Sequence, residues 1–328
     1  MTRAVLDPEV AVDRLKKATR ALLTSHRRPD GDALGSELAL AELADRLSVA
    51  TVILNRDPAP SSLGQLPGSQ QLQVADSLPH DFPEGFDLVV TLECTELERT
   101  GFDHLDRVAI LNIDHHRANP MFGEVNYVDE ASPAVGELVW RMFTAAGIDP
   151  SPAAATNAYV ALSTDTGDFR YSNATGRAFR AAAEMVDAGA DPAQVSTWIH
   201  ESRNLASVRL LGEALKTLTL GCDGRLATVE IDPAAFERCE ATPADSEEII
   251  NHPRSIAGVQ AVAFFKQWEP GVVQVSLRSK DDIDVRRVAS TFGGGGHTNA
   301  AGCTLNGQLS SAREQVTAEL ARLLERTP

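Results

Sequence analysis

The sequence has no long hydrophobic run, and no apolar stretch approaches the roughly 20 residues that a membrane-spanning helix needs. Its first residues also lack the apolar core of a signal peptide. The cysteines form no Cys-x-x-Cys pair, which argues against a disulfide scaffold and a structural zinc site. They are Cys94, Cys222, Cys239 and Cys303. We therefore expect a cytoplasmic protein without a membrane partner.

Positive charge is also scarce, because 30 Lys and Arg face 46 Asp and Glu and give a formal net charge of −16. The densest basic pairs are only Arg27-Arg28 and Arg286-Arg287. Proteins that follow long DNA or RNA use a basic surface to exploit counterion release. The composition therefore favours short oligonucleotides or a mononucleotide bisphosphate over long duplex nucleic acid. The alternative is an acidic surface that serves only solubility.

A length of 328 residues and a hydrophobic content of 43% predict about two packed domains. From Ala21 to about Ala190, apolar strand-like runs alternate with helical stretches, which is typical of βαβ units with a largely parallel sheet. The expected strands are 20–25, 50–54, 87–92, 108–113 and 124–128, and the expected helices are 33–48, 133–146, 153–164 and 175–189.

The remainder predicts a smaller α/β unit after a helical stretch over 193–218. Its expected strands are 225–231, 259–266 and 271–278, and its expected helices are 244–251, 284–291 and 311–325. We therefore predict an α/β protein with three segments. They are a mostly parallel N-terminal domain (1–190), a helical linker (191–218) and a smaller C-terminal domain (219–328).

The first group of polar residues, His26, Asp30 and Asp32, follows an apolar strand candidate and precedes a helical stretch. In an open parallel sheet, such a turn lies at the carboxyl edge of the strands, where α/β folds place their binding sites. Carboxylates with an imidazole suit Mn²⁺, Mg²⁺ or Fe²⁺ better than a thiolate-binding metal. The alternative is a turn in which an aspartate caps the helix and the histidine ends the strand.

A second group, Asp114-His115-His116, ends the strand candidate 108–113. The chain has 8 histidines, and three of them fall in these two groups, which is hard to explain by core packing. Glu93 ends another strand candidate and Asp165 ends a helix candidate, although single acids there also serve as caps. Together the groups predict a site for two divalent cations, and the chemistry typical of such a site is phosphoester hydrolysis.

The glycine run Gly293 to Gly296, followed by His297, predicts a phosphate-binding loop. Consecutive glycines expose backbone N–H groups, and a helix expected from Thr298 would add its dipole. Arg278, at the end of the neighbouring strand, can bind a phosphate bidentately. The alternative for the glycine run is a flexible hinge, and the alternative for Arg278 is an arginine exposed on the surface without a ligand. The expected substrate-binding residues are Arg278, Gly294, Gly295, Gly296 and His297.

The polar groups at His26, Glu93, Asp114 and Asp165 resemble, in their order along the chain, the motifs of the DHH phosphoesterase family. The glycine run with its histidine resembles the signature of the DHH-associated domain. The resemblance spans nearly the whole chain and is greatest to the short, two-domain nanoRNase/pAp-phosphatase (NrnA-type) members. The chain departs from the family at Glu93, where an aspartate usually bridges the two metals. The extra methylene of Glu93 displaces the carboxylate.

The resemblance implies a role for each site residue. His26, Asp30 and Asp165 would hold one metal, Asp32 and His115 the other, and Glu93 would bridge both. His116 would be catalytic, contacting a phosphoryl oxygen or protonating the leaving group, while Asp114 would orient the histidines. The expected cofactor is two Mn²⁺ per site, with Mg²⁺ or another divalent ion as the alternative. A homodimer is also expected.

The resemblance further implies a dimetal phosphodiesterase/phosphatase that converts short oligoribonucleotides such as pApA, and 3′-phosphoadenosine 5′-phosphate (pAp), to mononucleotides. The alternatives are a cyclic di-AMP phosphodiesterase and, from a different class, a non-catalytic nucleotide-binding sensor. A family II inorganic pyrophosphatase shares the N-terminal motifs, but the run Gly293 to His297 argues against it. A zinc hydrolase is disfavoured by the excess of carboxylates.

Overall fold

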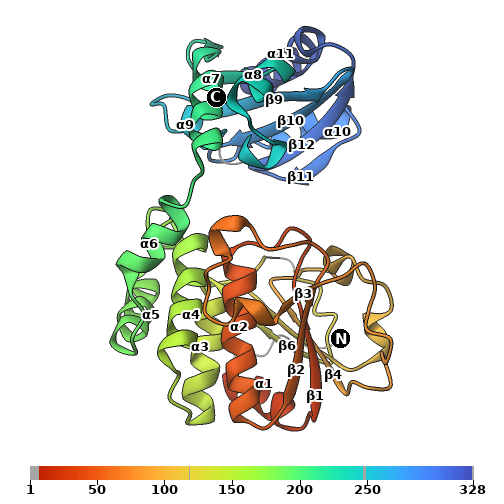
Figure 1. The fold of residues 1–328 in the computed structure, drawn as a ribbon, viewed down its shortest axis with the longest axis vertical. Coiled ribbons are helices and arrows are strands. Elements are labelled where there is room, and N and C mark those ends of the chain that lie inside the picture. Colours follow the sequence, from red (N-terminus) through yellow and green to blue (C-terminus); the bar gives the residue numbers. More distant parts are fainter. Residues whose placement is uncertain (1–6, 118, 247–248, 327–328) are drawn as a thin grey trace. The chain divides into compact units, whose positions relative to one another are not determined.

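The computed structural model describes residues 7–117, 119–246 and 249–326, and the chain forms two compact units that divide between Ser202 and Arg203 (Figure 1). Each unit is built on its own six-stranded sheet. Within the described ranges, no helix combines the length and the hydropathy that a membrane span requires.

The sheet of unit 1 is parallel throughout, with the strand order β3-β2-β1-β4-β5-β6. This confirms the predicted parallel sheet, and the short edge strand β3 is an addition to it. The strands are β1 (Arg20–Thr24), β2 (Ala50–Asn55), β3 (Leu72–Val74), β4 (Leu88–Leu92), β5 (Ile110–Asp114) and β6 (Val125–Val128).

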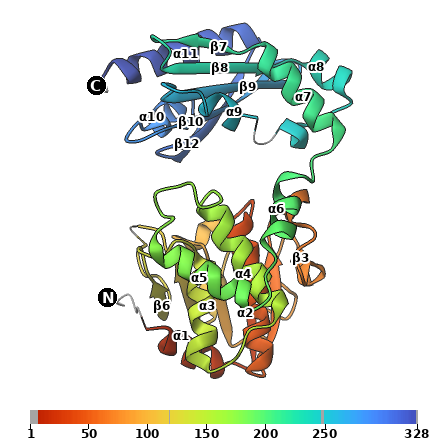
Figure 2. The ribbon, with the colours of Figure 1, turned by 90° about the vertical axis from the view of Figure 1, so that its left-hand side faces the viewer.

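Helices cover one face of this sheet, and Figure 2 looks onto α3, α4 and α5 on that face. The short helix α1 was not predicted from the sequence. The helices of unit 1 are α1 (Pro8–Lys16), α2 (Gly31–Arg46), α3 (Val135–Ala146), α4 (Pro152–Asp165), α5 (Gly176–Asp187) and α6 (Pro192–His200).

The strands of unit 1 are apolar because both faces of the sheet are covered. Leu23 and Val90 pack against the helical layer. Their neighbours Leu22 and Val89 point to the opposite face and pack against the loops and short 3₁₀ turns around Phe102. Alternate residues of each strand therefore enter two different hydrophobic clusters, which explains the continuous apolar runs in the sequence.

Helix α2 places Asp30 and Asp32 at the edge of the sheet. Its N-cap is Asp30, whose carboxylate accepts a hydrogen bond from the backbone N–H of Ala33 at 3.1 Å. Gly35 lets α2 approach α4 closely, because a Cβ at this position would lie 2.4 Å from the carbonyl oxygen of Asn157. Small residues therefore fix the distance between α2 and α4.

The strand order has a switch point between β1 and β4. The chain passes from β1 outward to β2 and β3, and then returns to place β4 on the other side of β1. Connections leave the two central strands in opposite directions at such a point, which opens a crevice at their carboxyl ends. Three ligand-bearing segments meet at this edge, because they follow β1, β4 and β5.

Unit 2 has a mixed sheet in the order β11-β12-β10-β9-β8-β7, in which only the pair β8 and β9 is parallel among the described strands. The strands are β7 (Thr219–Gly221), β8 (Leu226–Ile231), β9 (Ala261–Glu269), β10 (Val272–Ser279), β11 (Gly295–His297) and β12 (Ala300–Asn306). The helices are α7 (Leu205–Lys216), α8 (Pro233–Cys239), α9 (Asn251–Arg254), α10 (Val285–Thr291) and α11 (Leu309–Glu325).

Two hydrophobic clusters cover the two faces of this sheet. On one face, α10 and α11 pack against the sheet, and Val316 and Leu320 of α11 lie in the same cluster as Phe265 of β9. On the other face, α7, α8 and α9 cover β8 and the neighbouring part of β9, including Phe264. The predicted smaller α/β unit is confirmed.

The continuous helical stretch predicted over 193–218 is wrong, because two helices, α6 and α7, replace it. The helix α7 begins at Leu205, and its N-cap Asn204 accepts a hydrogen bond from the backbone N–H of Ser207 at 2.7 Å. Asn favours an extended backbone at an N-cap, and this ends the helical run before it. The division between the two compact units falls in this interruption.

A buried carboxyl group lies beside the carboxyl ends of β1 and β2. Glu37 of α2 is completely buried, and its Oε2 accepts a hydrogen bond from Asn55 Nδ2 at 2.7 Å. The Asn55 Oδ1 in turn accepts hydrogen bonds from the backbone N–H and the hydroxyl of Ser25 at 3.1 and 3.0 Å. Burial raises the pKa of Glu37 to about 8, so the group is a neutral acid at pH 7.

Glu37 predicts a specific pH dependence of stability. Its pKa is higher in the folded protein than in the unfolded chain, so its contribution is complete below pH 4.5 and is lost as the pH rises through about 8. In urea unfolding between pH 5.5 and 8.5, the wild type should lose stability relative to Glu37→Gln by up to about 1.4 kcal/mol per pH unit. Glu84→Gln, at an exposed position, is the control. Parallel pH profiles for wild type and Glu37→Gln would contradict the assignment.

Candidate metal centre

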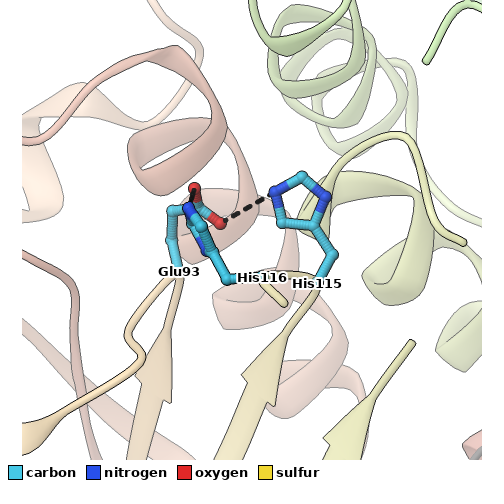
Figure 3. Close-up of side chains that lie close together, drawn as sticks. All are labelled: Glu93, His115 and His116. Carbon is cyan, nitrogen blue, oxygen red and sulfur yellow. Dashed lines mark ion pairs between the residues drawn. The ribbon is translucent and has the colours of Figure 1, made fainter. Parts of the chain in front are cut away.

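Five side chains gather at the carboxyl edge of the sheet in two overlapping groups. Within each group, ligand atoms lie within 4.8 Å of one another. One group contains Asp32, Glu93, His115 and Asp165, and the other contains Glu93, His115 and His116. Glu93 and His115 belong to both groups. Figure 3 shows the two imidazoles directed toward the Glu93 carboxylate.

His115 is the geometric centre of the site. Its Nε2 lies 3.4 Å from Glu93 Oε2, 3.8 Å from Asp165 Oδ2 and 3.9 Å from Asp32 Oδ2. Its Nδ1 faces the opposite way and lies 3.0 Å from the carbonyl oxygen of Ser132. The ring is therefore oriented from behind, and its Nε2 is presented to three carboxylates.

Asp32 is held at the N-terminus of α3. One of its oxygens accepts the backbone N–H of Val135 at 2.7 Å, and the other accepts that of Gly136 at 2.9 Å. The hydroxyl of Ser36 donates a third hydrogen bond at 3.0 Å. A helix N-terminus offers unpaired N–H groups and a favourable dipole to a carboxylate. The orientation of Asp32 is thus fixed by backbone groups far away in the sequence.

Glu93 follows β4 with a backbone φ of 62°, which is an uncommon conformation for a residue other than glycine. Its Oε1 lies 3.6 Å from His116 Nε2, and its Oε2 is a buried atom without a hydrogen-bond partner among the described residues. Burial alone would raise its pKa, but the adjacent His115 and His116 lower it. The longer side chain of Glu93 thus still reaches both histidines.

Asp114 ends β5 and is completely buried. Its Oδ1 lies 2.8 Å from His116 Nδ1 and accepts the backbone N–H of His115 at 2.9 Å. Its Oδ2 accepts a hydrogen bond from Asn119 Nδ2 at 2.5 Å. Burial opposes ionisation of Asp114, yet these hydrogen bonds and the imidazole of His116 lower its pKa. The carboxylate therefore faces the back of His116 and directs its Nε2 into the site.

His26 and Asp30 lie beside the two groups. His26 Nε2 is 3.9 Å from Asp30 Oδ2, and His26 Nδ1 lies 2.9 Å from the carbonyl oxygen of Arg27. The charge of Asp30 contributes to raising the pKa values of Asp32 and Asp165. These two residues thus lie at the same edge of the sheet, although neither belongs to the two groups.

The titration behaviour of the cluster reflects crowded carboxylates. Burial, together with the charges of Glu93 and Asp165, holds the pKa of Asp32 well above its usual range. Burial and the charges of Glu93 and Asp30 raise the pKa of Asp165 to about 6. Burial opposes the charged form of His115, but the surrounding carboxylates raise its pKa to about 11. Protons therefore compensate the negative charge in the absence of a cation.

The donor set fits a divalent cation. It offers carboxylate oxygens and imidazole nitrogens, and Cys94 contributes no thiolate because burial raises its pKa well above the usual range. Glu93 Oε2, which has no hydrogen-bond partner among the described residues and lies 3.4 Å from His115 Nε2, supplies a buried ligand atom. A bound cation would take the place of the protons that the cluster retains. The residues that would hold it are those of the two groups, with His26 and Asp30 beside them.

The second group of expected site residues lies in unit 2, and one expectation about it is wrong. No helix begins at Thr298, because the glycine run continues into β11, which forms a hairpin with β12. Gly294 and Gly296 pass so close to β12 that a Cβ would lie 2.2 Å from the Gly302 carbonyl and 2.5 Å from the Ala300 carbonyl. The run therefore forms an edge strand tightly paired to its neighbour, and the predicted helix dipole is absent.

Strand pairing places the expected phosphate-binding residues in one row. Arg278 of β10 pairs with Ala300 of β12, and Ala300 also pairs with His297 of β11. Arg278 is half-buried, and its Nη1 donates to the carbonyl oxygen of Leu277 at 3.1 Å. The backbone of His297 ends β11, and its side chain lies outside the described part of the structure.

Several supporting residues have no signal in the sequence. Asn119 holds the Asp114 carboxylate, and Asn173 Nδ2 donates to the carbonyl and carboxylate oxygens of Asp165 at 3.1 and 3.2 Å. Both are single asparagines in loops, where a turn residue is the ordinary expectation. Only the three-dimensional contact with a ligand distinguishes them.

The two parts of the chain match known domains. Residues 20–164 match the DHH family, N-terminal domain, and residues 231–326 match the DHHA1 domain. The bifunctional oligoribonuclease and PAP phosphatase NrnA of Thermus thermophilus is 32% identical over 297 residues, which covers 90% of this chain and 87% of that protein. The chain therefore belongs to the DHH family of phosphoesterases.

The expected similarity to the NrnA-type members of this family is also confirmed. The bifunctional oligoribonuclease and PAP phosphatase NrnA of Bacillus subtilis is 26% identical over 289 residues, covering 87% of this chain and 88% of that protein. Within the family, the gathered carboxylates and histidines fit a metal-dependent phosphoesterase.

Solved structures support the fold. An exopolyphosphatase-related protein from Bacteroides fragilis has a TM-score of 0.86 at 24% identity, covering 97% of this chain and 98% of that chain. The exonuclease RecJ bound to manganese has a TM-score of 0.53 at 15% identity, covering 98% and 97%. The shared feature is the fold.

Replacing Glu93 by Gln tests the centre, because the change keeps the volume and removes the charge that faces both histidines. We expect at least about tenfold weaker Mn²⁺ binding, which lowers the stabilisation by excess Mn²⁺ by about 1.4 kcal/mol. The measurement is the shift of the melting temperature on adding MnCl₂. Glu84→Gln, at an exposed position away from the site, is the matched control. An unchanged shift in Glu93→Gln would contradict the role of this carboxylate.

The hairpin predicts unequal responses within the glycine run. Gly296 has a φ of +137°, and its Cβ would also lie 2.7 Å from the Cα of Ala301, so Gly296→Ala should destabilise the protein by about 1–3 kcal/mol. Gly295→Ala is the control, because its Cβ would meet nothing within 4 Å. Urea unfolding measures both. Equal losses in the two variants would show that the run does not pair with β12 in this way.

Proposed function

We propose that this chain is a dimetal phosphoesterase that hydrolyses short oligoribonucleotides and pAp to mononucleotides. The observation that carries the proposal is the convergence of Asp32, Glu93, His115, His116 and Asp165 at the switch point of a parallel sheet. The relatives named bifunctional oligoribonuclease and PAP phosphatase, which match most of the chain, support this substrate class.

Manganese is the proposed cation. Two divalent cations, when bound, would activate a water molecule and offset the charge on the phosphoryl oxygens. The proposed holders of one are His26, Asp30 and Asp165, and those of the other are Asp32 and His115, with Glu93 shared. Carboxylate-rich sites with imidazole suit Mn²⁺ or Mg²⁺ better than softer metals.

His116 is the proposed catalytic acid. Burial works against its charged form, but the hydrogen bond and the charge of Asp114, with the charge of Glu93, raise its pKa. Asp114 accepts a hydrogen bond from the Nδ1–H of the protonated imidazole. The second proton is therefore on Nε2, on the side of the ring that faces Glu93. From there the imidazole can donate to a leaving oxygen or to a phosphoryl oxygen. Asp114 acts through the ring as a positioning residue.

Unit 2 is proposed to bind a second phosphate of the substrate. Arg278 carries a guanidinium suited to bidentate contact, and it shares a row of the sheet with Ala300 and His297. The edge strand β11 leaves backbone groups on its outer side that none of the described strands pairs with. Gly294, Gly295 and Gly296 would keep this edge free of side chains.

The charge and the cysteines support the remaining proposals. A net charge of −16 disfavours long polynucleotides, so we expect short substrates held by cations and local arginines. The four cysteines are free, which fits a reducing cytoplasm.

The test is hydrolysis by the full chain with MnCl₂, with initial rates compared for pApA, pAp and cyclic di-AMP. We expect AMP from pApA and pAp, and slower cleavage of cyclic di-AMP. Replacing Asp114, His115 and His116 together by Ala should abolish hydrolysis, because the change removes a ligand, the proposed acid and its positioning group. His80→Ala, at an exposed histidine of the same unit, should leave the rates unchanged.

Three outcomes would overturn the proposal. Faster cleavage of cyclic di-AMP than of pApA would assign the site to cyclic dinucleotides. Metal-dependent nucleotide binding without turnover would indicate a sensor that retains the fold. Full activity of the triple variant would refute the site itself.

A further inference from the structure

His115 is oriented by a loop outside the ligand groups. This loop, residues 129–137, runs from the end of β6 into the first turn of α3. Its Ser132 presents a carbonyl oxygen to His115 Nδ1 at 3.0 Å. The backbone N–H groups of Val135 and Gly136, which hold Asp32, belong to the same loop. One short segment thus sets the position of two residues in the centre.

Ser132 is itself held from both sides. Its backbone N–H donates to the carbonyl oxygen of Asp129 at 2.9 Å, and its hydroxyl donates to Glu137 Oε2 at 2.7 Å. The Asp129 Oδ1 closes the turn by accepting the backbone N–H of Ala131 at 3.0 Å. The side chains of Asp129 and Glu137 therefore help to fix the carbonyl that faces His115, together with the Ala134 carbonyl oxygen, which lies 2.8 Å from the Ser132 hydroxyl.

Arg177 of α5 binds both of these carboxylates. Its Nε donates to Glu137 Oε1 at 2.9 Å and its Nη2 to Glu137 Oε2 at 2.5 Å, which is a bidentate pair. Its Nη1 donates to Asp129 Oδ2 at 2.7 Å. The side chains of Glu137 and Asp129 are only 5% and 13% exposed. Without the guanidinium, Glu137 would lose its counter-charge, and Asp129 would keep only that of Arg141, whose Nη1 lies 3.6 Å from Asp129 Oδ2.

We propose that Arg177 is a positioning residue for the metal centre, which fixes His115 through Glu137, Asp129 and the Ser132 carbonyl. The inference rests on the proposed metal centre. The chain of contacts is continuous from α5 to the imidazole, and each link is a hydrogen bond of 3.0 Å or less. Hydrogen bonds behind a ligand fix the ring and its tautomer, and their loss typically weakens metal binding by about 10–100-fold.

The experiment compares Arg177→Ala with Arg180→Ala in the full chain. Arg180 lies one turn further along α5 and is exposed, so its removal alters the charge without touching the loop. Mn²⁺ affinity, measured by the electron paramagnetic resonance of free Mn²⁺, should fall about 10–100-fold in Arg177→Ala and stay unchanged in Arg180→Ala. Arg177→Lys, which keeps the charge but loses the bidentate geometry, should restore part of the affinity.

A second readout needs no metal. In ¹⁵N-histidine spectra of the metal-free protein, the Nδ1 proton of His115 should be protected from exchange by the Ser132 carbonyl, and this protection should be lost in Arg177→Ala. The His115 signal is assigned with His115→Gln. If Arg177→Ala does not fold, Glu137→Gln, which keeps the side-chain volume, and Ser132→Ala, which keeps the charge, interrupt the same chain of contacts, and both should weaken Mn²⁺ binding.

The outcomes separate this inference from the metal centre on which it rests. A wild type that binds no Mn²⁺ would refute the proposed centre. A wild type that binds Mn²⁺, with folded Arg177→Ala, Glu137→Gln or Ser132→Ala binding it equally well, would refute the positioning role alone. A fall in affinity of equal size in Arg180→Ala would reduce the effect to net charge and would also refute it.

Discussion

Mutual repulsion among buried carboxylates is the constraint on which this site depends. Asp32, Glu93 and Asp165 lie around one imidazole, His115, at the carboxyl edge of the sheet. Burial raises the electrostatic cost of each negative charge, and the cluster retains protons to limit that cost. A fold that tolerates such a concentration of charge gives up stability in the metal-free state. The gain is a site ready to exchange its protons for divalent cations.

The surrounding structure supplies compensation at several levels. The first turn of α3 offers its free N–H groups to Asp32, Asn119 and Asn173 hold Asp114 and Asp165, and Arg177 neutralises the carboxylates of the supporting loop. None of these groups is a ligand in the two clusters. They fix the directions in which the ligands point, which is what metal sites require beyond the ligands themselves.

In unit 2, the sequence pattern predicts which residues lie together but not the conformation of their backbone. The run Gly293 to Gly296 predicted a functional segment, and its position beside Arg278 agrees with the strand pairing. The expected helix at Thr298 is absent because the glycines are required by the close approach of β12. The same run of consecutive glycines is compatible with a loop before a helix and with a tightly paired edge strand. The difference lies in which backbone they approach.

The sequence by itself determined the parallel sheet, the family and the residue types of the centre. Apolar runs that end in His, Asp or Glu are local patterns, so they can be recognised within short segments of the sequence. Two departures from it, the interruption at Asn204 and the unpredicted helix α1, also depend on local capping, but their signals are short and weak. Only the tertiary structure decided that Ser132, Glu137 and Arg177 stand behind His115. Their physical role comes from contacts between residues up to 40 positions apart, which no spacing in the chain records.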